Sequence, residues 1–127
     1  MNTKALMTLS AILMASGGIA ASFLPQEILS YSGSDASAFE VLLVQVIGAL
    51  YLGFAILNWM ARGNLIGGVY SRPVAMGNFL HFAVVAVTLL KALLGGTRAE
   101  ILLAGAVVYS IFAVWFGLVL FTHPAKH

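Results

Sequence analysis

Apolar residues along the chain fall into four long runs separated by short polar breaks. The runs cover residues 5–24, 38–61, 73–94 and 99–121. Each reaches the ~20 residues that an α-helix needs to cross a hydrocarbon core about 30 Å thick. Backbone polar groups in lipid must be satisfied within their own segment, so we expect four membrane-spanning helices. The predicted fold class is an all-α integral membrane protein, a four-transmembrane-helix antiparallel bundle forming a single membrane domain over residues 1–127.

The composition also favours lipid over water as the solvent of this chain. Of its 127 residues, 61% are hydrophobic and 8% are charged, whereas a soluble domain carries about 25% charged residues. A soluble protein of this size has too little interior to bury so much apolar surface. The chain contains no cysteine, which excludes disulfides, thiolate catalysis and cysteine metal sites. Its Lys and Arg residues are scattered, so we expect no nucleic-acid partner.

The first apolar run has some features of a secretory signal peptide. Lys4 precedes it, and the sequence Ala20-Ala21-Ser22 resembles a cleavage site. The run is longer than the apolar core of about 7 to 15 residues that is typical of signal peptides. We therefore interpret residues 5–24 as a membrane helix.

The first two breaks contain residues that favour turns. Residues 25–37 combine Pro, Gly and several serines, which predicts a turn. Residues 62–72 contain a Gly-Gly pair and lead into Pro73. Proline suits the first turn of a helix, and Ser71 is placed to help cap that helix.

The third break, residues 95–98, is only four residues long. A connection this short makes the helices on either side antiparallel neighbours. Thr97 with Glu100 three residues later fits a capping box, which predicts the start of the last helix.

Small residues mark faces on which helices approach each other closely. On the first helix such a ridge is formed by Ala11, Ala15, Gly18 and Ser22. On the second, Ala49 and Gly53 form a small-xxx-small pair. Closed symmetric pairs are common among proteins, so a homodimer or a larger membrane complex is a compatible partner arrangement alongside the membrane lipids themselves.

The distribution of basic residues predicts the orientation, because cytoplasmic loops carry an excess of Lys and Arg. Four spans place both termini and residues 62–72 on one side of the membrane. That side carries Lys4, Arg62, Arg72 and Lys126. The other side carries Lys91 and Arg98. A margin of four to two favours cytoplasmic N and C termini, and the pattern is compatible with a bacterial inner membrane.

Polar side chains inside a membrane are costly, so their positions are the main clue to function. On the helix predicted over residues 38–61, Tyr51, Asn58 and Arg62 share one stripe. On the next helix, Asn78 and His81 are three residues apart. We expect the two stripes to face each other.

Two further contacts follow from the expected depth of each residue in the membrane. Tyr109 on the last helix should lie near the level of His81. Glu40 and Lys91 come to similar heights at the outer end, where we predict an ion pair.

The polar cluster has two interpretations. One is that Asn, His and Tyr side chains join the helices by hydrogen bonds, each contributing about 0.6 kcal/mol. The other is a ligand pocket open to the cytoplasm, lined by Tyr51, Asn58, Asn78, His81 and Tyr109. A proton relay through His81 also stays open, because histidine titrates near neutral pH.

Residues 62–72 suggest an anion site. Arg72 begins a helix, where free N–H groups and the helix dipole favour negative charge, and Arg62 stands at the other end of the same break. A lipid phosphate or a phosphorylated ligand would fit there. The alternative is a tight turn whose arginines touch lipid headgroups nonspecifically.

No cofactor, metal site or catalytic residue is predicted. His123 and His127 are the other two histidines, both in the C-terminal tail, so His81 has no second ligand for haem or a metal. A nucleophile–base pair is also missing, which makes catalysis the last-ranked option. It would rest on His81 acting alone as an acid or base toward a lipid.

Several families have four helices in a similar length, but their motifs do not match. Small multidrug-resistance transporters need a membrane-embedded glutamate in their first helix, and residues 5–24 contain no acid. Dimeric fluoride channels have an early glycine-rich stretch followed by an arginine, which is missing there too, although Asn78, Phe79 and Phe82 faintly resemble their polar and phenylalanine positions. DoxX-like proteins share only the layout. We assign the chain to none of them.

The sequence therefore favours a non-catalytic membrane protein. It would bind a lipid-like or small amphipathic ligand, or serve as an accessory subunit of a membrane complex. The alternative is a small dimeric transporter or channel with a polar path along the helices over residues 38–61 and 73–94. That path is thin, because only Tyr51 and Thr88 connect the inner polar residues to Glu40 and Lys91.

Overall fold

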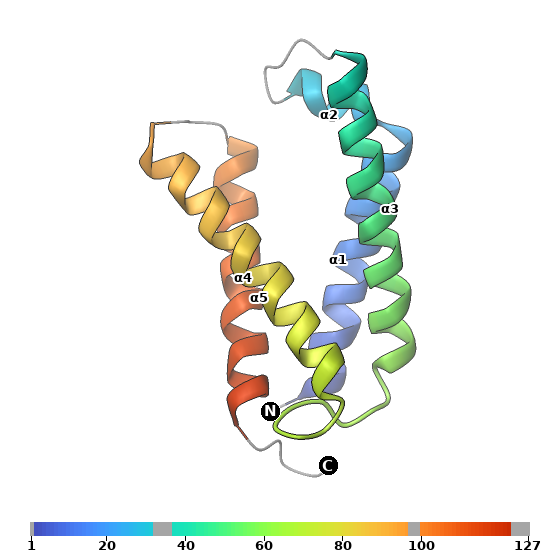
Figure 1. Ribbon diagram of the computed structural model, residues 1–127, viewed down its shortest axis with the longest axis vertical. Coiled ribbons are helices and arrows are strands. Elements are labelled where there is room, and N and C mark those ends of the chain that lie inside the picture. Colours follow the sequence, from blue (N-terminus) through green and yellow to red (C-terminus); the bar gives the residue numbers. More distant parts are fainter. Residues whose placement is uncertain (1, 32–36, 97–99, 123–127) are drawn as a thin grey trace. The chain divides into compact units, whose positions relative to one another are not determined.

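The four apolar runs form the four long helices of the protein. The computed structural model describes residues 2–31, 37–96 and 100–122. Its long helices are α1 (Thr3–Phe23), α3 (Ala38–Ala61), α4 (Arg72–Leu94) and α5 (Glu100–Phe121) (Figure 1). With 21 to 24 residues each, they are about 31 to 36 Å long at 1.5 Å per residue. All four are long and apolar enough to cross a membrane, which confirms the predicted all-α, four-span membrane fold.

A fifth helix occupies part of the break that we predicted to be a turn. The short helix α2 (Pro25–Tyr31) begins directly after α1. Pro25 suits a first helical position because it has no N–H to leave unsatisfied, and Glu27 lies in the first turn, where the helix dipole favours negative charge. The half-buried Ile28 and Leu29 give α2 an apolar side, and the helix packs against α3. Residues 32–36 lie outside the described residues.

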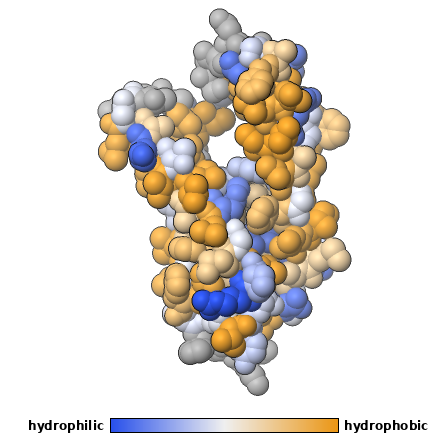
Figure 2. Space-filling view, in the orientation of Figure 1, coloured by the Kyte–Doolittle hydropathy of each residue, from blue (hydrophilic) through white to orange (hydrophobic). Residues whose placement is uncertain are grey.

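The outer surfaces of the helices are apolar, as expected for segments in contact with lipid. Leu50 and Ile56 on α3 are each 61% exposed, and Val114 on α5 is 63% exposed. Figure 2 shows apolar atoms covering most of the visible surface along the helices. Water would penalise so much exposed apolar surface, so these side chains fit a hydrocarbon environment.

The chain divides into two compact units. One unit is Met7–Ala61, and the other consists of Met1–Leu6 with Arg62–His127. The first unit holds most of α1 together with α2 and α3. The second holds the start of α1, residues 62–71, α4 and α5.

Glycine allows α1 and α3 to approach each other within the first unit. A Cβ atom added to Gly48 would lie 2.6 Å from the Ser22 hydroxyl oxygen and 3.0 Å from the Gly18 carbonyl oxygen. At Gly18 it would lie 2.8 Å from Cγ of Leu52. These pairs run in opposite directions along the chain, so the helices are antiparallel. Gly18 and Ser22, two members of the predicted ridge, therefore pack against α3.

Aromatic side chains join α4 and α5 in the second unit. Phe82 is fully buried, and its ring centroid lies 5.0 Å from Tyr109, 5.1 Å from Phe112 and 5.5 Å from Phe116. Ring pairs at such separations contribute about 0.5 to 1.5 kcal/mol beyond their buried area. Spacing of four and three residues along α5 places all three partners on one helical face.

Residues 62–71 form an ordered turn fixed to the end of α5. Gly67 and Tyr70 exchange two backbone hydrogen bonds of 2.9 and 2.8 Å, and the Gly68 N–H donates to the Val119 carbonyl oxygen at 3.3 Å. Gly67 has φ +122°, and a Cβ there would overlap the Val119 carbonyl oxygen. Only glycine fits both the backbone angle and the close approach. Ile66 beside it is fully buried.

The start of α4 differs from the prediction. Ser71 has φ 46° and ψ 42°, a left-handed conformation, and its side chain makes no capping hydrogen bond. A residue that caps a helix with its side chain usually has an extended backbone. After the Gly67–Tyr70 turn, the chain instead enters α4 through the left-handed Ser71. The Ser71 carbonyl oxygen instead accepts bonds from the N–H groups of Val74 and Ala75, both at 3.1 Å. The capping prediction for Ser71 is wrong. Thr97 lies outside the described residues, so the capping box it forms with Glu100 stays a prediction.

Candidate functional site: polar contacts and a cationic cavity

The predicted polar residues are divided between the two units. Tyr51, Asn58 and Glu40 belong to the unit Met7–Ala61. The other unit contains Asn78, His81, Tyr109, Lys91, Arg62 and Arg72. The predicted pocket and the Glu40–Lys91 ion pair both combine residues of the two units, so they stay predictions.

Asn58 forms a polar contact between α1 and α3. Its side-chain Nδ2 donates to the hydroxyl oxygen of Ser10 at 3.0 Å, and the Ser10 hydroxyl donates to the Met7 carbonyl oxygen at 3.1 Å. Both Asn58 and Ser10 are fully buried. The arrangement matches the helix-joining role that polar side chains have in membranes. Ser10 was not among the predicted residues, although its spacing of seven from Gly17 places both on the side of α1 that meets α3.

Tyr51 packs over a glycine of α1. A Cβ atom added to Gly17 would lie 3.1 Å from Cδ2 of the Tyr51 ring. The half-buried ring therefore fills the space that the missing side chain leaves. In this position Tyr51 contributes packing to the α1–α3 pair.

His81 and Tyr109 meet between α4 and α5, as their predicted levels suggested. Their ring centroids are 5.6 Å apart, and the His81 ring lies 5.0 Å from Phe82. The Nε2 atom of His81 is buried. Three residues earlier, the buried Asn78 donates from Nδ2 to the Val74 carbonyl oxygen of its own helix at 2.9 Å. The surroundings of His81 are thus mainly aromatic. Within the described residues, no group of three or more His, Asp or Glu side chains is placed to hold a metal ion.

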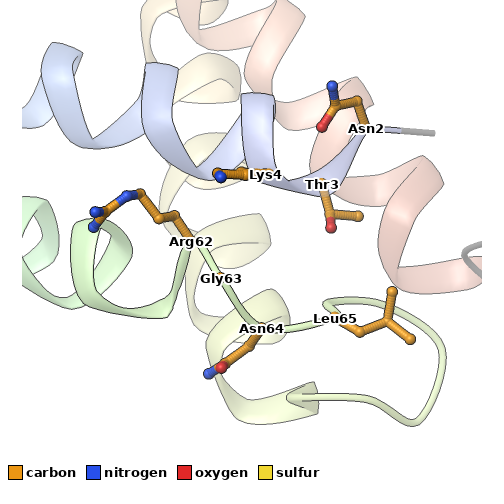
Figure 3. Close-up of a pocket in the computed structure, with 7 residues that line it drawn as sticks. All are labelled: Asn2, Thr3, Lys4, Arg62, Gly63, Asn64 and Leu65. Atoms are coloured by element: carbon orange, nitrogen blue, oxygen red, sulfur yellow. The ribbon is translucent and has the colours of Figure 1, made fainter. Parts of the chain in front are cut away.

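A cationic cavity lies in the second unit, where the start of α1 meets residues 62–65. Its volume is about 290 Å³. The lining residues are Asn2, Thr3, Lys4, Arg62, Gly63, Asn64 and Leu65. Figure 3 shows Lys4 on the first turn of α1 and Arg62 just after α3, with their charged ends directed to the same side of the view. The described lining contains two cations and no carboxylate, so the cavity favours an anion.

Local structure holds Lys4 in place at this cavity. The Asn2 side-chain oxygen accepts a hydrogen bond from the Ala5 N–H at 3.0 Å, which caps α1. Lys4 therefore lies on the first turn of a capped helix, where the helix dipole adds positive potential. Lys4 is exposed and Arg62 is half-buried.

The two arginines predicted to bind an anion have different positions in the structure, and only Arg62 lines the cavity. Arg62 lines the cavity, with Lys4 as a neighbour that the sequence did not single out. Arg72 is exposed, and its Nη1 donates to the Gly68 carbonyl oxygen at 2.9 Å. Arg72 thus stabilises the turn that leads into α4. The sequence feature that could have identified Lys4 as a cavity residue is its predicted location on the same side of the membrane as Arg62.

Comparison of the chain with protein-family models, curated proteins and solved structures finds no match.

Proposed function

We propose that this chain is a non-catalytic membrane protein that binds a lipid-like amphiphile with an anionic head. The observation that carries the proposal is the cavity whose described lining includes the two cations Lys4 and Arg62. Lys4 is the second residue of α1, and Arg62 directly follows α3. The cavity therefore lies where two apolar spans end, at the depth of lipid headgroups.

The surroundings of the cavity suit an amphiphile better than a fully water-soluble ligand. The spans that end there expose large apolar side chains, including Leu9 and Ile12 on α1 and Met60 on α3. An acyl chain attached to a head in the cavity would remain in contact with hydrocarbon. Basic residues near a membrane surface attract anionic lipid by about 1 kcal/mol each.

The proposal includes an orientation in the membrane, with both termini in the cytoplasm. Lys4, Arg62 and Arg72 all lie in the unit whose turn contacts Val119 near the end of α5, whereas Lys91 lies in the last turn of α4. The excess of positive charge near the turn supports cytoplasmic termini, in a bacterial inner membrane. The anionic head would then be bound from the cytoplasmic leaflet.

Native mass spectrometry of the protein released from mild detergent tests this function. We expect the wild-type chain to retain an anionic amphiphile, and the double variant Lys4→Gln/Arg62→Gln to lose it. Lys91→Gln is the matched control, since it removes one positive charge near the opposite end of α4 and should leave retention unchanged.

Three outcomes would contradict the proposal. Equal retention in all three proteins would mean that lipid binds without using the cavity. A bare wild-type dimer would favour the alternative of a small transporter that works along Asn78 and His81, and a bare monomer would favour an accessory subunit that has lost its partner.

A further inference from the structure

We propose that the turn of residues 62–71 inserts Val69 and Tyr70 into the headgroup region of the membrane and so anchors the end of α5 in the interface. The partner is the lipid surface of the leaflet, in particular its anionic headgroups. This contact is separate from the Lys4–Arg62 cavity and would remain if that cavity bound nothing. The level of the turn along α5, its fixed backbone and the side chains at its tip support the contact.

The turn lies beside the last residues of a membrane span. The Gly68 N–H donates to the Val119 carbonyl oxygen at 3.3 Å, and Val119 is two residues before the end of α5 at Phe121. Those two residues correspond to about 3 Å along the helix axis. The 22 residues of α5 span about 33 Å, slightly more than a hydrocarbon core of about 30 Å. The turn is therefore at the level where hydrocarbon meets headgroups.

Hydrogen bonds and packing hold the tip of the turn at this level. Gly67 and Tyr70 exchange two backbone hydrogen bonds. The Arg72 side chain donates to the Gly68 carbonyl oxygen at 2.9 Å, and Ile66 is fully buried. The tip can move away from the end of α5 only if these contacts break, so its depth in the membrane follows that of the span.

The side chains at the tip suit the interface. Val69 is 72% exposed and Tyr70 is 46% exposed. Leu118 and Phe121 at the end of α5 are also exposed, so the span remains apolar at this level. Tyrosine is enriched at membrane–water interfaces because its ring is apolar and its hydroxyl group is polar. In the headgroup region, Val69 would leave water while the Tyr70 hydroxyl group could still form hydrogen bonds.

The charge of the turn complements anionic headgroups. Residues 62–72 contain no Asp or Glu. The Arg72 side chain is exposed, and a guanidinium group has several N–H donors. One of them holds the Gly68 carbonyl oxygen, so another can bind a lipid phosphate while the turn stays intact. Basic residues near a membrane surface attract anionic lipid, which makes the leaflet a suitable occupant of this surface.

Site-directed spin labelling measures the depth of the tip. The chain has no cysteine, so a nitroxide can be attached to Val69→Cys, or to Tyr70→Cys as a second position, in the full-length protein. Each variant is reconstituted in vesicles of phosphatidylcholine and phosphatidylglycerol. Power saturation then compares collisions of the label with oxygen, which concentrates in lipid, and with a water-soluble nickel chelate. We expect both tip labels to collide more with oxygen than with nickel.

Two further positions and a second kind of vesicle serve as controls. Gly63 is exposed at the start of the same connection, and a label on Gly63→Cys should collide mainly with nickel. A label on Leu118→Cys, at an exposed position of α5, should collide mainly with oxygen. In vesicles of phosphatidylcholine alone, the tip labels should become more accessible to nickel, because Arg72 then has no anionic lipid to bind.

Each contrary outcome has a definite meaning. Tip labels that collide with nickel as often as the Gly63 label would place the tip in water and overturn the proposal. Protection from both reagents would mean that protein covers the tip, which would also overturn it. Unchanged nickel collisions in phosphatidylcholine alone would overturn the assignment of anionic headgroups. None of these results affects lipid retention in Lys4→Gln/Arg62→Gln, so this proposal and the proposed function fail independently.

Discussion

The hydrogen bond between Asn58 and Ser10 is the clearest example of a polar side chain with a structural role in this membrane protein. Both residues are fully buried, and the bond is 3.0 Å long. Sequence alone identified Asn58 as a polar residue inside a span, and it left both a helix contact and a ligand pocket as interpretations of its position. The hydrogen bond to Ser10 supports the helix contact. Partners across helices are determined by packing, which a stripe of residues on one helix does not specify.

A double-mutant cycle measures this bond. We expect Asn58→Ala and Ser10→Ala to show a coupling energy of about 0.6 kcal/mol, and at most about 1.7 kcal/mol, in unfolding experiments in detergent. Ser16→Ala is the matched control, because its exposed hydroxyl donates to the Ile12 carbonyl oxygen of its own helix. Ser16→Ala combined with Asn58→Ala should be additive within about 0.3 to 0.5 kcal/mol. Additivity of the Ser10 pair as well would contradict the role of this bond.

At the scale of helices, the sequence predicted the four membrane spans, but it did not predict local features that depend on contacts with other elements. The four spans begin and end within two residues of the predicted bounds, because hydrocarbon leaves the backbone no alternative to a helix. Helix α2 was missed because seven residues show too little periodicity to outweigh the signal of Pro and Ser. The left-handed Ser71 was missed because the turn before it is fixed by contact with Val119, far along the chain.

The glycines of α3 also show that the sequence does not determine which small residue contacts a neighbouring helix. The sequence singled out Ala49 and Gly53 as a packing pair, but Ala49 is exposed and a Cβ on Gly53 would meet nothing within 4 Å. The close approach to α1 occurs at Gly48 instead. Adjacent small residues face different directions on a helix, and only the position of the neighbouring helix shows which one is needed.

Replacing these glycines should therefore have opposite effects. Gly48→Ala forces a methyl group against Ser22 and should destabilise the α1–α3 pair by about 1 to 3 kcal/mol, the usual cost of overpacking. Gly53→Ala on the same helix should cost nothing and can gain up to about 1 kcal/mol, because alanine is the better helix former. Unfolding of both variants in one detergent checks this. A similar loss in both would mean that the face containing Gly53 is also packed.

At the scale of the whole molecule, the positions of the basic residues are the link between fold and proposed function. Lys4 and Arg62 are far apart in sequence, and the hydropathy pattern predicted only that they share a side of the membrane. The structure brings them to one cavity. Their shared side could be predicted from the number of spans, whereas their adjacency could not, because it depends on how the start of α1 meets residues 62–65.

The orientation of the chain determines which leaflet supplies the ligand, and it is directly measurable because the sequence has no cysteine. Two exposed positions, Gly63 in the turn and Ser30 in α2, suit single cysteine substitutions. If the positive end faces the cytoplasm, Gly63→Cys should react with a membrane-impermeant maleimide only after the cytoplasmic side is opened, and Ser30→Cys should react in intact cells.

The reverse labelling would place Lys4 and Arg62 at the outer leaflet, and the ligand would have to come from there. Labelling of each cysteine from both sides would mean that the chain inserts in both orientations. In that case the cavity would face both leaflets, and either leaflet could supply its ligand. The predicted orientation depends on a margin of only four basic residues to two. Adding or removing Lys and Arg residues near the spans can reverse a topology, so the labelling experiment tests the prediction directly.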